Sequence, residues 1–330
     1  MQSTNDIIQA KDSVREVVTM NNQIAYIMAV TKIKGLGPKT LLPYLQDKKY
    51  IETEEAAYKM VSQIYQENSR IKIIPTKEEF SCWIKEAKAC LDKQDTLDIH
   101  GICYGDKDYP NGFKSLDKPP LYFFYKGNKK ALKQEGIAVI GTRNVTPYTE
   151  TIGKHIGSYV AQKGLTVISG LALGSDTAGH TGCLQAKGTT IAIVATALDT
   201  VYPKKNAPLQ NEILANGGCV ISEYPIGTPF IARHLVERDR LQSGLAKGVI
   251  VAATGEIGGT WHAVNEAFSL NKPVAYFDYT KCKKYDYKND PHVLGMSKMK
   301  IKGAKPIFYG REVDVFLKSC VQLKEKGMNR

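Results

Sequence analysis

Apolar runs alternate with amphipathic stretches along the second half of the chain. Six runs rich in β-branched residues cover residues 137–140, 166–169, 190–196, 219–224, 249–253 and 273–277. They are apolar throughout instead of alternating, which is typical of strands covered on both faces. Helical patterns fill the gaps near residues 148–163, 176–186, 207–215, 234–246 and 261–270. The pattern predicts an α/β fold with a doubly wound, Rossmann-like parallel sheet.

The first hundred residues carry a helical pattern instead. Residues 1–22 are polar and charged without firm periodicity, so we expect a flexible leader there. Residues 23–100 are expected to form a small α-helical domain, because apolar helical stretches flank a glycine turn at residues 33–40 and amphipathic spacing continues beyond it. Residues 101–330 then form the Rossmann-like domain, including an N-terminal connector rich in Pro, Gly and aromatic residues.

The turn IKGLGPKT at residues 33–40 resembles a helix-hairpin-helix unit. In that motif, glycines such as Gly35 and Gly37 let the backbone approach a phosphate, because no Cβ intervenes and the amides point outward. Lys39 follows at the start of the second helix. A helical hairpin whose glycine turn only joins two helices is the alternative interpretation.

The tract from Ile137 to His180 contains two candidate phosphate-binding turns. Each apolar run there ends in a Gly-bearing turn and then a helix, an arrangement that aims backbone amides and a helix N-terminus at an anion. The residues placed to meet a phosphate are Gly141, Thr142, Arg143, Ser169, Gly170, Gly174 and Ser175. Neither turn has the GxGxxG pattern, and no GxxxxGK[ST], HExxH or GxSxG motif occurs. The motifs therefore predict neither an ordinary NAD site nor P-loop hydrolysis.

The charge of the chain points to a polyanionic partner. The formal net charge is +12, and residues 281–330 alone hold thirteen Lys or Arg against five Asp or Glu, a net of +8. Four tyrosines are interleaved with the first of these lysines: Tyr276, Tyr279, Tyr285 and Tyr287. Single-stranded nucleic acid uses such a mixture of phosphate contacts and stacking surfaces. A solvated basic face above core tyrosines is the equal alternative.

The cysteines and the distribution of apolar residues indicate the cellular compartment of the protein. Seven cysteines are scattered without CxxC spacing, which is typical of reduced thiols. No run of about 18 apolar residues is present, and the first residues lack the apolar stretch of a signal peptide. We therefore expect a cytoplasmic protein without a membrane partner. No trio of His, Cys and acidic residues has metal-ligand spacing, so no metal site is expected.

Several motifs in order resemble the DprA family of DNA-processing proteins, also called Smf. The turn VIGTRNVTPY is similar to the family's GSRxxTxYG type, and SGLALGSDTAGH is similar to SGxAxGIDxxAH. The resemblance also covers GDKDYP, DKPPLYFFYKGN, TALDTVYPKKN, SEYPIGTPF, RHLVERDRLQSGLA and GMSKMKIKGAKPI. With the helix-hairpin-helix turn in front, it spans about residues 24–317.

The resemblance implies single-stranded DNA binding, loading of a RecA-type recombinase, and homodimerisation, without a known catalytic cycle or a cofactor. The residues that match the family's DNA-contacting motifs are Arg143, Gly170, Gly174, Arg238 and Arg240. Lys204 and Arg233 lie in adjoining matched motifs and are further candidate phosphate contacts. On a helix, Arg238 and Arg240 diverge by about 200°, so we expect only one of them to face the groove.

Two segments depart from the family pattern. Where the family commonly reads FPxRNRIISG, this chain reads LVERDRLQSG, so Leu235 replaces an aromatic residue suited to base stacking and Asp239 replaces Asn. The loop GGTWHA replaces a loop of SGSLIT type, and its Gly259 and Thr260 precede a helix in a way that suits one phosphate.

These departures keep two other functions open. Members of the wider superfamily bind or process nucleotides, and some act as sensors in defence systems. On that alternative, Glu223 or Glu266 is a candidate acid or base, although either can equally be a solvated or ion-paired side chain. A regulator that acts only through a partner protein fits as well.

Overall fold

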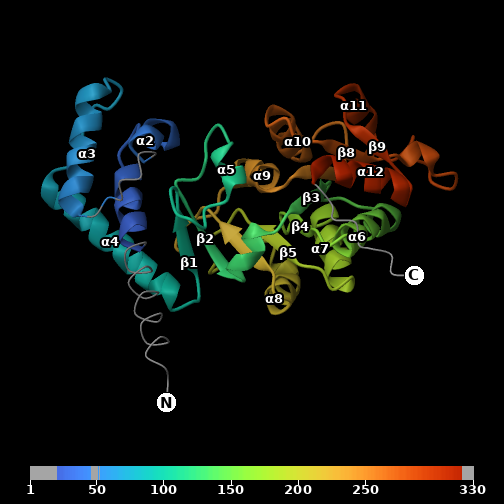
Figure 1. The fold of residues 1–330 in the computed structure, drawn as a ribbon, viewed down its shortest axis with the longest axis horizontal. Helices are drawn as coiled ribbons and strands as arrows, with labels where there is room; N and C mark the ends of the chain where they lie inside the picture. Colours follow the sequence, from blue (N-terminus) through green and yellow to red (C-terminus); the bar gives the residue numbers. More distant parts are fainter. Residues whose placement is uncertain (1–20, 46–50, 52, 322–330) are drawn as a thin grey trace, which may run out of the picture. The chain divides into compact units, whose positions relative to one another are not determined.

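The computed structural model describes residues 21–45, 51 and 53–321, and they form two compact units (Figure 1). Unit 1 comprises the described residues up to Tyr109 together with Asp117–Tyr125 and Glu223–Gly227. Unit 2 comprises Pro110–Leu116, Lys126–Ser222 and the described residues from Thr228 onward. Nearly all of the expected leader lies outside the described residues, as do the last basic residues of the chain.

Unit 1 is mainly helical. Residues 21–31 are helical, and the elements that follow are α2 (Pro38–Leu45), α3 (Glu54–Glu67), α4 (Lys77–Asp95), β1 (His100–Cys103) and the first four residues of β2 (Tyr122–Gly127). Helix α4 begins at a capping box, in which Thr76 and Glu79 each accept the other's backbone N–H. Its buried face presents Phe80 and Ile84, and β1 pairs antiparallel with β2.

Unit 2 contains a parallel sheet of seven strands. Its strands are β3 (Gly136–Gly141), β4 (Thr166–Ser169), β5 (Thr190–Ile193), β6 (Cys219–Ser222), β7 (Gly248–Ala253), β8 (Val274–Phe277) and β9 (Lys305–Ile307). Its helices are α5 (Asn111–Lys114), η1 (Lys129–Lys133), α6 (Pro147–Gln162), α7 (Ser175–Gln185), η2 (Lys204–Asn206), α8 (Ala207–Ala215), α9 (Arg233–Leu245), α10 (Thr260–Ser269), η3 (Tyr279–Lys281), α11 (Met296–Ile301) and α12 (Gly310–Cys320). The predicted Rossmann-like α/β fold is confirmed.

The strand order shows that the sheet is doubly wound. From one edge the order is β6, β5, β4, β3, β7, β8, β9, with every neighbouring pair parallel. The chain runs outward from β3 to β6, returns beside β3 at β7, and then runs outward in the other direction. The order therefore reverses between β3 and β7, where open α/β sheets commonly bind their ligands.

Helices cover both faces of this sheet, which explains the uninterrupted apolar runs. Helices α6 and α7 pack on each other and on β3 and β4, whereas α9 and α10 form a separate pair that contacts β3 and β7 (Figure 1). Every residue of β4, β5, β6, β7 and β8 is buried. Among the described helices, none combines the length and the apolar composition that crossing a bilayer requires.

Candidate nucleic-acid interface

A polar cavity of about 520 Å³ lies where β3 and β7 end. It is lined by residues from the β3–α6 turn, from the β4–α7 turn with the start of α7, from α9, from the loop before α10 with the start of that helix, and from the segment before α11: Ile140, Gly141, Thr142, Arg143, Asn144, Ala172, Asp176, Arg238, Asp239, Gln242, Thr254, Gly255, Glu256, Ile257, Gly258, Gly259, Thr260, Ala263, Pro291, His292 and Leu294. This is the edge at which the strand order reverses, so the fold places a ligand-sized hollow where such sheets use one.

The first turn, between β3 and α6, leaves its arginine exposed. The Thr142 amide donates to the carbonyl of Ala253 at the end of β7 (2.7 Å), which fixes the backbone of the turn. Thr146 then caps α6 through Thr149. Arg143 is exposed, and within the described part of the chain its guanidinium makes no hydrogen bond or ion pair. The turn therefore presents a positive charge, free to bind an anion, at the cavity rim.

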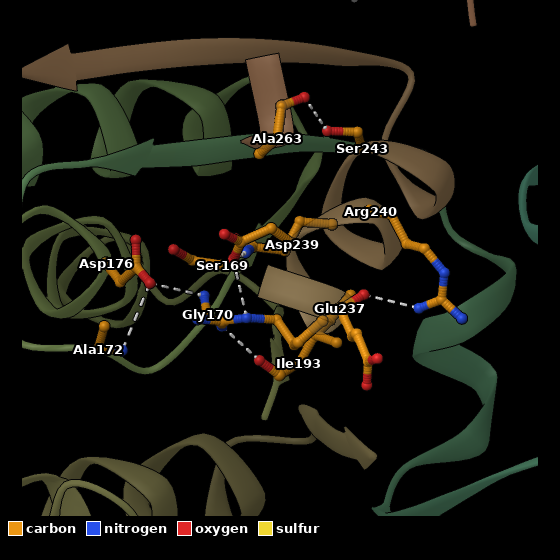
Figure 2. Close-up of polar contacts among 12 residues, drawn as sticks. Ser169, Gly170, Ala172, Asp176, Ile193, Glu237, Asp239, Arg240, Ser243 and Ala263 are labelled. Carbon is orange, nitrogen blue, oxygen red and sulfur yellow. Dashed lines mark hydrogen bonds and ion pairs between the residues drawn. The ribbon is translucent and has the colours of Figure 1, made fainter. Parts of the chain in front are cut away.

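The second turn, between β4 and α7, directs its amides onto its own side chain. Asp176 Oδ2 accepts hydrogen bonds from the amides of Gly170 (3.1 Å) and Ala172 (3.4 Å), as Figure 2 shows. The buried Ser169 hydroxyl donates to the carbonyl of Val139 (2.6 Å), and Ser175 is buried as well. The donors that the sequence assigns to a phosphate at this turn thus have internal partners or lie away from the surface.

The two turns interlock through Gly174. This residue has φ of +81°, and a Cβ there would overlap the carbonyl oxygens of Thr142 and Arg143. The Ser175 amide donates to the Thr142 carbonyl at 3.0 Å. Only glycine combines this backbone conformation with such a close approach, so the second turn buttresses the first.

Arg238 is buried beneath the second turn. Its Nη1 donates to the carbonyl of Ile193 (2.6 Å), and its Nε lies 3.2 Å from Asp239 Oδ1. A Cβ on Gly170 would overlap this guanidinium, so the glycine makes room for it. Arg240, by contrast, points away from Asp176 and Asp239 and donates to the carbonyl of Glu237 at 2.7 Å (Figure 2). One arginine of the pair therefore lines the cavity and the other does not.

The cavity floor is acidic and desolvated. Burial raises the pKa of Asp239 to about 6, with Asp176 adding to the shift and Arg238, His262 and Arg143 opposing it. Burial likewise raises the pKa of Asp176, against the attraction of Arg238. The floor therefore combines two desolvated carboxyl groups with the Arg238 guanidinium, whereas the rim carries the exposed Arg143, so a phosphate is favoured at the rim.

The other sequence-predicted contacts lie around this cavity or apart from it. Gly259 and Thr260 line it at the start of α10, and Lys204 is exposed at the start of η2. Arg233 is 79% exposed in its side chain and forms an ion pair with Glu237 at 2.6 Å.

Lys39, next to the turn of Gly35 and Gly37 in unit 1, forms an ion pair with Asp117 at 2.7 Å. Glu223 belongs to unit 1, and Glu266 lies outside the cavity lining.

An apolar pocket adjoins the polar cavity and shares Arg143, Ala172 and Arg238 with it. Its remaining lining residues are Gly170, Leu173, Ala195, Tyr202, Pro203 and Leu235. Tyr202 is 45% exposed and stacks on Phe230, with ring centroids 4.6 Å apart and planes 28° apart. Sequence reasoning did not single out these two rings. Phe230 follows Thr228 and Pro229 in a turn-like segment, so its pairing with Tyr202 depends on the tertiary structure.

The tyrosines of the basic segment divide between the core and the surface. Tyr276 and Tyr279 are buried, whereas Tyr285 and Tyr287 are half-buried. The two buried rings therefore fit the interpretation of core tyrosines, and the two half-buried rings fit the interpretation of a stacking surface.

Comparisons with known proteins identify the family. The chain is 28% identical to DNA processing protein DprA of Bacillus subtilis over 296 residues, which cover 88% of this chain and 95% of that protein. The X-ray structure of DprA from Streptococcus pneumoniae superposes with a TM-score of 0.68 at 26% identity, covering 88% of this chain and 97% of the other. A Helicobacter pylori DNA processing protein A, described for its single-stranded DNA binding mode, gives 0.58 at 26% identity and covers 67% and 96%.

The match to the family itself covers most of unit 2. A family model described as DNA recombination-mediator protein A matches residues 100–313, which contain both turns, the polar cavity and the apolar pocket. The chain therefore belongs to the DNA recombination-mediator protein A family, known also as DprA or Smf.

Proposed function

We propose that unit 2 binds single-stranded DNA along the groove where β3 and β7 end. The observation that carries this proposal is Arg143, which is exposed, has no partner among the described residues, and lines both the polar cavity and the apolar pocket. A guanidinium can hold a phosphate through two hydrogen bonds, and the adjoining apolar pocket suits the base of the same nucleotide. The Helicobacter pylori relative with a single-stranded DNA binding mode supports the same ligand here.

The stacked pair of Tyr202 and Phe230 supplies the aromatic surface that Leu235 does not. Both rings are more than a third exposed, and Tyr202 lines the pocket beside Arg143. Base stacking on an aromatic side chain contributes roughly 1 to 3 kcal/mol per base and needs a base free of its neighbours. The pocket therefore favours single strands over duplex.

The test is a salt-dependent binding titration with a fluorescent single-stranded oligonucleotide. Arg143→Ala is expected to weaken binding by about 10- to 100-fold, since a charge-assisted phosphate contact contributes roughly 1.5 to 3 kcal/mol. It should also reduce the slope of log K against log salt by about one. Arg311→Ala is the matched control, because Arg311 is an exposed arginine on α12 outside both cavities. Equal affinities of the two variants would refute the proposal.

We further propose that the DNA-bound protein acts as a homodimer that loads a RecA-type recombinase, without a catalytic reaction of its own. The description of the family as recombination mediators supports this role. In a filament-assembly experiment on strands coated with single-strand binding protein, the wild type is expected to speed recombinase loading and Arg143→Ala to lose that effect. Sedimentation over a concentration series tests the dimer.

A nucleotide is the second candidate ligand, and Gln242 favours it. Its side chain lines the polar cavity, the residue is 2% exposed, and its Oε1 is buried without a hydrogen-bond partner in the described structure. Its Nε2 donates to Asp239 Oδ1 at 3.1 Å, so a nucleobase amino group is a suitable donor to the free oxygen. A panel of mononucleotides at millimolar concentration should then raise the melting temperature. A flat response would favour the DNA proposal alone.

A further inference from the structure

The first turn continues into an exposed tyrosine that heads a stack of three rings. Tyr148, in the first turn of α6, is 39% exposed and stacks on Tyr285 with ring centroids 4.5 Å apart and planes 16° apart. Tyr285 in turn lies against Tyr279 at 5.4 Å, and Tyr279 is 2% exposed. The exposed ring of Tyr148 therefore packs on Tyr285, and Tyr285 packs on the buried ring of Tyr279. These two rings, Tyr285 and Tyr279, are the support of Tyr148.

Hydrogen bonds hold the support in place. The Tyr279 hydroxyl donates to the carbonyl of Ala252 in β7 at 2.8 Å, and the Tyr285 hydroxyl donates to the buried carboxylate of Asp290. Asp290 also accepts from the His292 amide at 2.8 Å. Because His292 lines the polar cavity, this network fixes the stack next to the groove in which Arg143 lies.

Basic residues flank Tyr148 and Tyr285 along the chain. Arg143 precedes it on the same turn, and Lys283 and Lys284 lie directly before Tyr285; both lysines are exposed, and neither has an ion pair among the described residues. Lys288 is exposed as well, whereas the nearby Asp286 is the one acidic residue between Lys281 and Lys288. Exposed aromatic rings among unpaired cations are the two components of a single-strand binding surface.

We infer that Tyr148, supported by Tyr285, is a second stacking site for a nucleobase of single-stranded DNA, with Lys283 and Lys284 on the adjoining phosphates. The inference rests on the proposed function and extends it: the strand runs from the apolar pocket past Arg143 and over the Tyr148 ring. An aromatic ring tolerates any base, so this site adds affinity without selecting sequence.

The experiment combines an abasic-site scan with one substitution. A series of oligonucleotides, each lacking one base, is titrated against the wild type and Tyr148→Ala. The wild type should lose about five-fold or more in affinity at one position near the Arg143 phosphate, and Tyr148→Ala should bind weakly but show no further loss at that position. Tyr148→Phe keeps the ring and should restore binding relative to Tyr148→Ala. Tyr65→Ala is the matched control, since Tyr65 is 40% exposed on α3.

Two further measurements keep the result unambiguous. Lys283→Ala with Lys284→Ala should lower the salt slope by up to about two while leaving the abasic profile intact. If Tyr148→Ala fails to fold, photo-crosslinking of the wild type to oligonucleotides carrying 5-iodouracil at each position replaces it, and a cross-link at Tyr148 is expected. This inference alone would be overturned if Arg143→Ala weakens binding but wild type and Tyr148→Ala have identical abasic profiles and no cross-link forms at Tyr148. Absence of any salt-sensitive binding would overturn the proposed function and this inference together.

Discussion

The two glycine turns of unit 2 look alike in sequence and differ in chemistry. In the β3–α6 turn the backbone is fixed by Ala253, and Arg143 extends into solvent without a partner in the described structure. In the β4–α7 turn the amides of Gly170 and Ala172 are bound by Asp176. The first turn is available to a ligand and the second holds the first in position. A strand, a glycine turn and a helix therefore do not by themselves identify a phosphate site.

Among the substitutions that test this difference between the two turns, Gly170→Ala is expected to have the largest effect on stability. The added methyl group would overlap the buried Arg238 guanidinium, and displacing that group separates it from Ile193 and Asp239. We expect a loss of about 3 kcal/mol or more in the free energy of unfolding, measured by urea denaturation. Gly37→Ala is the control, because no atom lies within 4 Å of a Cβ built there. Similar stabilities of the two variants would show that the Gly170 contact is dispensable.

Asp176→Ala and Arg143→Ala should separate stability from binding. Removing the Asp176 carboxylate leaves two amides without their acceptor and takes a counter-charge from Arg238, so unfolding is expected to become easier by about 2 to 3 kcal/mol. Arg143→Ala should change the free energy of unfolding by less than about 0.5 kcal/mol. Urea denaturation measures both. A destabilised Arg143→Ala would contradict the assignment of the first turn to the ligand.

Asp239→Asn should remove a pH dependence of stability. Because the pKa of Asp239 is raised to about 6 in the folded state, this group stabilises the fold below about pH 4 and loses that contribution as pH rises through about 6. At pH 7.5 the Asn variant is therefore expected to gain up to about 2 kcal/mol relative to the wild type, and little at pH 4.5. Melting curves across this range provide the measurement. Parallel curves for wild type and Asp239→Asn would exclude the effect.

Lys39→Ala gives the smallest expected effect and concerns a third glycine turn. Lys39 and Asp117 are both well exposed, so the loss of their ion pair should change the free energy of unfolding by less than about 0.5 kcal/mol. If the helix-hairpin-helix turn contacts DNA, the salt slope falls by about one while the affinity changes only a few-fold. An unchanged slope would favour the alternative in which this turn only joins two helices.

The sheet and its helices were predictable because burial on both faces leaves an uninterrupted apolar run. Strands from β3 to β8 coincide with those runs, although β5 ends at Ile193 and β6 at Ser222, sooner than predicted. Strand β9 escaped prediction because it has three residues, two of them exposed. A strand that short and that polar leaves no periodic signal.

The roles of the site residues were harder to predict, for a physical reason. The letters SGLALGSD place Asp176 near the amides of its own turn, but they do not show whether those amides face the carboxylate or a phosphate. The stack of Tyr202 on Phe230 joins two segments that are distant in sequence, so no local pattern announces it. The opposite directions of Arg238 and Arg240, in contrast, follow from helical geometry alone.

The interlock at Gly174 has a kinetic consequence. Because the backbone of the Arg143 turn is already held by Gly174, Ser175 and Ala253, its ordering entropy is lost during folding and not during association. Association with DNA should then be fast and governed by long-range attraction between the strand and the basic surface. Oligonucleotides should consequently differ in the dissociation rates of their complexes, and little in their association rates.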